Sequence, residues 1–179
     1  FFLNTYTKIN CKNWLKIFLE NYKDKRFIGY TGSYASIPSQ FFGFYHSQYS
    51  KFQQLRWGIN HFRKFKLFPN PHVRTNGFLI KGIDLISLNF DRKLLKNKIE
   101  TNYFESGRQN ITIQLQKKGF EVGIVNSDSI FFEVKRWKES DTYCLNNQEK
   151  LIFTDNRTSE YQFSNLNKRA KMTKFCWGI

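Results

Sequence analysis

The chain has 179 residues, 40% of them hydrophobic and 18% aromatic, a composition that excludes a disordered segment and predicts one domain with a buried core. Its net charge of +15 favours polyanionic partners such as nucleic acid, anionic lipid or a diphosphate, unless it only reflects a lysine-rich background. No apolar run reaches the ~20 residues of a membrane-spanning helix, and the three cysteines lack the spacing of a structural zinc site.

Strand and helix patterns alternate along the first part of the chain. "FFLN" predicts the end of a strand, and because it begins in mid-element we expect a piece of a longer protein. An asparagine at position 10 or 13 can cap a helix through "NWLKIFLENY", and "FIGYTGSY" predicts a strand ending in small residues. From Ser39 to Phe65, aromatic and basic residues recur at helical spacing, which predicts a long amphipathic helix.

The later elements are shorter. Two prolines precede the predicted strand "GFLI", and "IDLISL" and "KLLKNKIETNYF" predict short helices. Residues 108–118 predict a helix that closes at Gly119, and "FEVGIV" and "SIFFEV" predict strands. The remainder is polar and loop-like, with short helices expected near Asn147–Phe153 and Leu166–Phe175. About four strands alternating with helices predict an α/β fold, and the small number of strands suggests that part of a sheet is missing.

Glu105 is the first candidate for chemistry. It lies between aromatic residues and a Ser-Gly turn, directly before the predicted helix at residues 108–118. A helix N-terminus stabilises a carboxylate as the anion, which is the form that a general base requires. The same position would also suit a carboxylate that only caps the helix.

A dense polar group, "HVRTN", precedes the strand "GFLI". Arg74 could clamp a phosphate or carboxylate with two hydrogen bonds, while His72 and Asn76 bind sugar hydroxyls. The alternative is a turn fixed by the prolines, with Arg74 in solvent. Arg108 could pair with Glu105 or with a departing diphosphate, or it could be a surface arginine.

Three further features allow binding. Thr31, Gly32 and Ser33 could bring backbone N–H groups close to a diphosphate or sugar, or form a plain turn. Trp137, in "KRWK", could stack on a sugar ring or a nucleobase, and Asp155 in "TDNRT" predicts a turn. The helix at residues 39–65 could rest on anionic lipid, bind nucleic acid, or pack on the core with a solvated basic side.

In their order along the chain, these stretches resemble a GT-A glycosyltransferase of the family-two type. "FFLNTYTKINCKNWLKIFL" resembles the family's strand, metal-binding loop and following helix, and "PNPHVRTNGFLIKG" resembles its acceptor-side strand. "YFESGRQNITIQLQKKGFEVGIV" resembles the segment that carries the family's catalytic base. "FESGR", "DNRTSEY" and "FCWG" resemble a bacterial subgroup of uncharacterised glycosyltransferase-like proteins.

The resemblance implies that residues 1–179 form the C-terminal part of a GT-A domain, a mixed sheet flanked by helices without the N-terminal nucleotide-binding strands. Such a protein would transfer a sugar from a nucleotide-sugar donor to a glycan or lipid-linked acceptor in bacterial surface polysaccharide synthesis. Glu105 would be the base. The substrate-binding residues would be Thr31, Gly32, Ser33, His72, Arg74, Asn76, Arg108 and Trp137.

The family's Asp-x-Asp pair, which holds Mg²⁺ or Mn²⁺, is replaced here by Asn4-Thr5-Tyr6-Thr7. Metal use is therefore implied only for the full-length protein, and this chain supports none. We expect a cytoplasmic protein that reaches the inner face of the membrane. Two alternatives remain: a non-catalytic basic module that binds nucleic acid or another polyanion, and a degenerate glycosyltransferase that only binds glycan.

Overall fold

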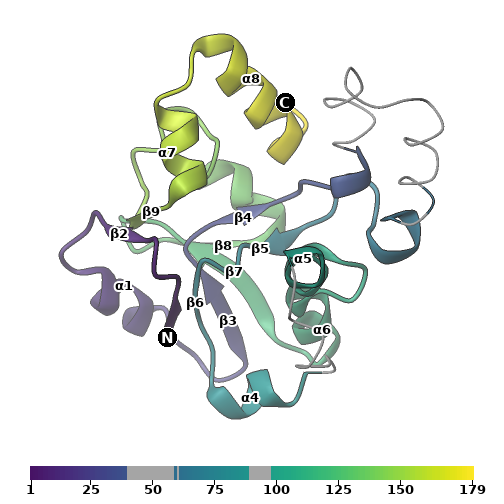
Figure 1. Cartoon of the computed structure of the whole chain (residues 1–179). Helices are drawn as coiled ribbons and strands as arrows, with labels where there is room; N and C mark the ends of the chain where they lie inside the picture. The colour runs from purple at the N-terminus through teal and green to yellow at the C-terminus, as the bar shows by residue number, and fades with distance from the viewer. Residues whose placement is uncertain (40–58, 60, 89–97) are drawn as a thin grey trace.

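The computed structural model describes residues 1–39, 59, 61–88 and 98–179, and Figure 1 shows their arrangement. Most of the long helix predicted from Ser39 to Phe65 lies outside the described residues, as does the start of the helix predicted at "KLLKNKIETNYF". Within the described ranges, no helix combines the length and the apolar character needed to cross a bilayer.

The described residues form a mixed five-stranded sheet in the order β1-β6-β3-β7-β8. At its centre β3 (Arg26–Gly29) runs parallel to β7 (Glu121–Val125), and the other pairings are antiparallel. The central strands are short apolar runs, which suits strands that are covered on both faces. The remaining strands are β1 (Phe2–Leu3), β6 (Gly77–Leu79) and β8 (Phe131–Glu133). Helices flank this sheet in Figure 1, so the predicted α/β architecture with a mixed sheet is confirmed.

Two hydrophobic clusters lie on opposite faces of β3, because neighbouring side chains of a strand point in opposite directions. Phe27 belongs to the larger cluster, which includes Leu115 and Trp137. Ile28 belongs to the smaller cluster, with Phe18 beside it. Burial of side chains of this size stabilises the fold by about 1.5–3 kcal/mol each.

A second, two-stranded sheet positions polar residues beside the main sheet. β4 (Gly32–Ser33) pairs with β5 (His72–Val73) in antiparallel register, with Ser33 opposite His72. The small-residue stretch after β3 therefore continues into a strand and does not form a plain turn. Its pairing brings the "TGS" and "HVRTN" segments together.

The structure contains the predicted helices α1 (Trp14–Glu20), α4 (Gly82–Ile86) and α8 (Leu166–Trp177), and the helix predicted at residues 108–118 is present as α6 (Ile111–Lys117). The prediction was wrong around Glu105. This residue lies in the last turn of α5 (Lys98–Ser106), and α6 (Ile111–Lys117) begins only after Asn110, whose side chain accepts a hydrogen bond from the N–H of Ile113 at 2.9 Å. Glu105 therefore neither caps α6 nor benefits from the positive end of its dipole.

The C-terminal region has more regular structure than its polarity predicts. The 3₁₀-helix η3 (Val134–Glu139) follows β8, and α7 (Asn156–Gln162) precedes α8. β2 (Lys8–Ile9) pairs with β9 (Phe153–Thr154). The helix predicted near Asn147–Phe153 is absent, because Gln148 has a φ of 57°, which a right-handed helix excludes.

Candidate functional site

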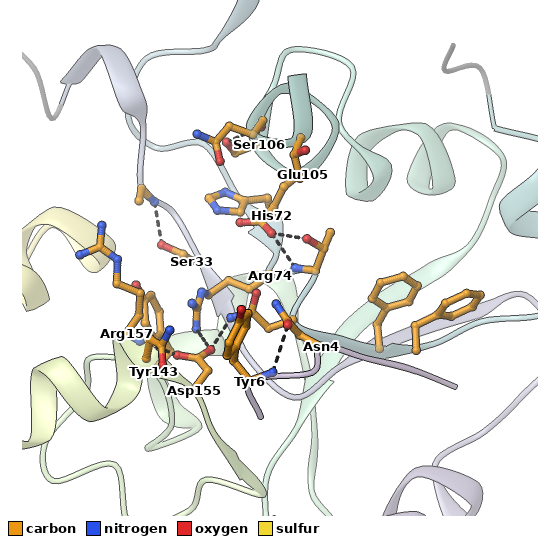
Figure 2. A pocket seen from close by; sticks show the side chains of 18 of the residues that line it. Asn4, Tyr6, Ser33, His72, Arg74, Glu105, Ser106, Tyr143, Asp155 and Arg157 are labelled. Atoms are coloured by element: carbon orange, nitrogen blue, oxygen red, sulfur yellow. Dashed lines mark hydrogen bonds and ion pairs between the residues drawn. The ribbon is translucent and has the colours of Figure 1, made fainter. Parts of the chain in front are cut away.

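A pocket of about 790 Å³ opens between the loop after β1, the β5–β6 turn, the end of α5 and the start of α7 (Figure 2). The pairing of β1 with β6 and of β4 with β5 brings these distant segments of the sequence together. The polar and titratable residues that line the pocket are Asn4, Tyr6, Ser33, His72, Arg74, Thr75, Asn76, Thr101, Asn102, Glu105, Ser106, Tyr143, Asp155, Asn156 and Arg157.

Five of the candidates from the sequence line this pocket together: Ser33, His72, Arg74, Asn76 and Glu105. The loop at residues 4–7, which the resemblance compares with an Asp-x-Asp pair, also reaches it through Asn4 and Tyr6. The main chain fixes this loop, since the N–H of Asn4 donates to the carbonyl of Asn76 at 2.8 Å. Three segments therefore face one cavity: the loop at Asn4, "HVRTN" and the segment that carries Glu105. The resemblance assigns them to different parts of a transfer site.

The other candidates do not line the pocket. Trp137 is fully buried, and its indole N–H donates to the carbonyl of Phe132 at 3.0 Å, so neither ring face is open to a sugar or base. A Cβ at Gly32 would lie 2.5 Å from Trp137 Cε3, so Trp137 packs closely against the backbone of the residue before Ser33. The exposed Arg108 donates to the carbonyl of Phe62, and the buried Thr31 accepts the N–H of Arg74 through its own carbonyl.

Glu105 presents one bound and one open oxygen to the pocket. Its Oε2 accepts hydrogen bonds from the N–H of Thr75, at 2.8 Å, and from the Thr75 hydroxyl. Its Oε1 has no hydrogen-bond partner among the residues that the structure describes. Thr75 thus fixes the carboxylate while leaving an oxygen available to a ligand.

His72 lies beside Glu105, as Figure 2 shows, and is buried. Its Nδ1 lies 2.8 Å from the carbonyl oxygen of Asn70, so Nδ1 carries the proton and Nε2 keeps its lone pair in the neutral ring. Burial lowers the pKa of His72, against the opposing effects of the Glu105 charge and the Asn70 carbonyl. The imidazole is therefore neutral at pH 7 and can accept a hydrogen bond from a ligand.

Arg74 forms an ion pair with Asp155. The Nη1 atom of Arg74 lies 2.9 Å from Oδ2 of Asp155, and its guanidinium carbon lies 3.9 Å from the centre of the Tyr143 ring. Tyr30 donates its hydroxyl to the same Oδ2 at 2.8 Å, and Asn76 donates its amide. Burial alone would raise the pKa of Asp155, but the Arg74 charge and the surrounding donors outweigh it and hold this pKa well below its ordinary value.

The sequence did not single out Asp155, which it assigned to a turn. The residue does begin a helix: its Oδ1 accepts the N–H groups of Arg157 and Thr158, and the Thr158 hydroxyl accepts the N–H of Asp155. An aspartate three residues before a threonine was the available signal for this capping box. Nothing local indicated that the second carboxylate oxygen binds Arg74.

The pocket is electrically balanced although the chain carries +15. Among the described residues, its charged lining consists of two cations, Arg74 and Arg157, and two anions, Glu105 and Asp155. Arg74 is neutralised by Asp155, and Arg157 pairs with Glu160 at 2.7 Å. The described lining of this cavity therefore carries no cationic excess.

The donor set does not fit a divalent cation held by the protein. Within the described ranges, no three His, Cys, Asp or Glu side chains gather as a metal site. Asn4 offers the pocket an amide where the resemblance implies carboxylates, and the Asp155 carboxylate is committed to Arg74. Mg²⁺ and Mn²⁺ favour several charged oxygen ligands, whereas the described lining leaves one carboxylate, Glu105, outside an ion pair.

Comparisons of the chain with protein-family models, with curated proteins and with solved structures found no match. What the pocket does is therefore inferred from its own residues.

Proposed function

We propose that this chain carries the acceptor side of a GT-A-like sugar-transfer site, with Glu105 as the general base. The observation that carries the proposal is the state of its carboxylate, which has one oxygen fixed by Thr75 and the other open to the pocket beside His72. Oε1 of Glu105 would take the proton of an acceptor hydroxyl. At the same time, the hydroxyl oxygen of the acceptor would form a bond to the anomeric carbon of the donor. The bond from this carbon to the diphosphate breaks, and the diphosphate leaves with the bonding electrons. A positioned base of this kind contributes about 10²–10⁴-fold to the rate.

The balanced charge of the lining supports a neutral, hydroxyl-rich ligand. The neutral ring of His72 can accept a hydrogen bond through Nε2, and the amide of Asn4 can both donate and accept. Arg74 adds a fixed guanidinium, but Asp155 cancels its charge. A sugar acceptor is compatible with such a lining, whereas a polyanion would meet no net positive charge here.

The mixed sheet, with a parallel pair at its centre and the polar loops gathered at one edge, is compatible with a GT-A-like domain. We extend the proposal to a nucleotide-sugar donor and a glycan or lipid-linked acceptor, used on the cytoplasmic side of a bacterial membrane in surface polysaccharide synthesis. Donor contacts other than those of this pocket are not part of the proposal.

The test is a transfer assay on the full reading frame that encodes this chain. A panel of nucleotide sugars is offered with glycan and lipid-linked acceptors, with and without Mn²⁺. Glu105→Gln should lower the transfer rate by about 10²–10⁴-fold while the protein stays folded. The matched control is Glu133→Gln, at an exposed glutamate outside the pocket, which should transfer at the wild-type rate. Full transfer by Glu105→Gln would remove Glu105 from the mechanism.

The neutral loop at Asn4 favours a second candidate, a glycan-binding domain that has lost transfer. That protein would bind glycans through the same pocket, and no donor would support turnover. Salt-sensitive binding of RNA or DNA without any sugar turnover would instead favour a polyanion-binding module.

A further inference from the structure

The turn between α7 and α8 exposes two large apolar side chains. Phe163 is 85% exposed and Leu166 is 81% exposed, the two highest values among the large hydrophobic residues that the structure describes. They lie three positions apart, and Figure 1 shows this turn at the outer edge of the molecule, away from the central sheet. Exposed apolar side chains indicate an interaction site when polar or charged residues border them, so the neighbours of this turn decide its role.

The surroundings of this turn are cationic. No Asp or Glu occurs from position 161 to the end of the printed chain, while α8 carries Lys168, Arg169, Lys171 and Lys174. Lys168, Lys171 and Lys174 follow one another at three-residue steps, so they share the exposed side of the helix. Lys168 pairs with Glu160 at 2.9 Å, whereas Lys171 and Lys174 have no ion pair in the described part of the chain.

Further cations share a recess with Phe163. Lys8 and Lys12 line a recess of about 830 Å³ together with Phe163, and Glu149 is the acidic residue in that lining. The apolar turn is thus bordered by lysines from α8 and from the β2 region, and positive charge exceeds negative charge on both sides.

We propose that the α7–α8 turn docks on an anionic lipid bilayer. Phe163 and Leu166 would enter the boundary between head groups and acyl chains, and the lysines would contact the lipid phosphates. An aromatic and an aliphatic side chain bordered by lysines suit this interface. The apolar side chains would contact the acyl chains, and the lysines would contact the anionic head groups. Nucleic acid would match the charge, but it offers Leu166 no apolar partner.

The position of this turn relates the surface to the pocket. The first residues of α7 line the pocket, and the seven residues of α7 span about 10 Å at 1.5 Å per residue. Docking through the far end of α7 would therefore hold the pocket close to the lipid surface. Docking of the α7–α8 turn does not depend on sugar transfer, and it uses none of the residues from 39 to 65.

The test is co-sedimentation of the purified protein with vesicles of phosphatidylcholine alone or mixed with phosphatidylglycerol. The wild type should bind the anionic vesicles and release them at high salt. The double substitution Phe163→Ser/Leu166→Ser should lower partitioning by about tenfold or more. Lys171→Gln/Lys174→Gln should lower binding by about tenfold on anionic vesicles only.

The matched control is Ile83→Ser/Ile86→Ser on α4. These isoleucines are 71% and 60% exposed, but their charged neighbours are Asp84 and the Lys81–Asp24 pair. The control should bind vesicles as the wild type does. Circular dichroism verifies that each variant is folded.

Three outcomes would overturn the inference: no binding of the wild type to anionic vesicles, equal binding by Phe163→Ser/Leu166→Ser, or an equal loss in the α4 control. If the first of these outcomes occurs and Phe163→Ser/Leu166→Ser or Lys171→Gln/Lys174→Gln loses RNA binding, nucleic acid is favoured as the partner. Transfer to a soluble acceptor is measured in parallel. If that transfer is intact in a variant that has lost vesicle binding, docking and catalysis are separate properties.

Discussion

Asp155 neutralises Arg74 inside the pocket wall: Oδ2 of Asp155 lies 2.9 Å from Nη1 of Arg74, and both side chains are buried. We expect Asp155→Asn to lower the free energy of unfolding by about 3–5 kcal/mol, because it leaves the guanidinium charge buried without a counter-charge. Asparagine is also a good N-cap, so the helix start is preserved, and the loss combines the missing charge with the hydrogen bonds that Oδ2 accepts from Tyr30 and Asn76. Urea unfolding measures the loss.

A double-mutant cycle follows when the cation of this pair, Arg74, is removed as well. Arg74→Met combined with Asp155→Asn leaves neither charge buried, so the double variant should be more stable than Asp155→Asn alone. If the two substitutions lower stability additively, the ion pair has no coupling energy and the assignment fails.

Thr75 should control the base without touching the substrate hydroxyl. Thr75→Val removes the hydroxyl that donates to Glu105 but keeps the backbone N–H donor. Since a hydrogen bond to a charged group contributes ~1.5–3 kcal/mol, we expect kcat for sugar transfer to fall about tenfold with little change in KM. Thr75→Ser, which keeps the hydroxyl, should restore most of the rate. Wild-type kcat in Thr75→Val would show that the hydroxyl does not position the base.

Gly32 should tolerate no side chain, because a Cβ there would meet the Trp137 ring at 2.5 Å. We expect Gly32→Ala to cost about 1–3 kcal/mol, the usual range for an overpacked core. Gly82→Ala is the matched control, since a Cβ at Gly82 meets no atom within 4 Å and alanine favours the helix α4. Chemical denaturation compares the two. A stability of Gly32→Ala equal to that of Gly82→Ala would contradict the close contact.

His72 should make stability depend on pH below neutrality. Burial lowers the pKa of His72 below its ordinary 6.5, so the unfolded chain takes up this proton at a higher pH than the folded chain does. The contribution of His72 to the free energy of unfolding is fully present above pH 6.5. It is lost as the pH falls below 6.5, by at most about 1.4 kcal/mol per pH unit. His72→Gln should flatten the curve between pH 7 and pH 5 in urea titrations. An unchanged slope would mean that other groups cause the acid sensitivity.

Elements with a strong local pattern could be predicted from the sequence. β3 and β7 are short apolar runs bounded by charged or turn residues, and α1 and α8 repeat apolar residues at helical spacing. β4 and β5 have two residues each, too few to show a period, so their pairing could not be seen. The prediction placed Glu105 at the start of the helix at residues 108–118, whereas this residue ends α5 and α6 starts later, because the capping signal of Asn110 was overlooked.

The site could be predicted only in part, because local sequence patterns show crowded polar residues but do not show contacts between distant residues. The polar residues of "HVRTN" are crowded in the sequence, and the structure places several of them in one pocket. Asp155 was missed because its partner Arg74 lies 81 residues earlier, and no local rule reports a contact over that distance. Trp137 follows basic residues, which suggested an exposed ring, but η3 turns the indole into the core.

The lining of the pocket begins at Phe2 and ends at Phe175, almost the whole length of the chain. A cavity built from segments this far apart in the sequence closes late in folding, because the entropy of joining distant segments must be overcome before their contacts form. A ligand of this pocket therefore recognises only the finished fold. Its binding would report native protein directly, and it would distinguish a folded variant from a compact chain that has kept its helices but not its site.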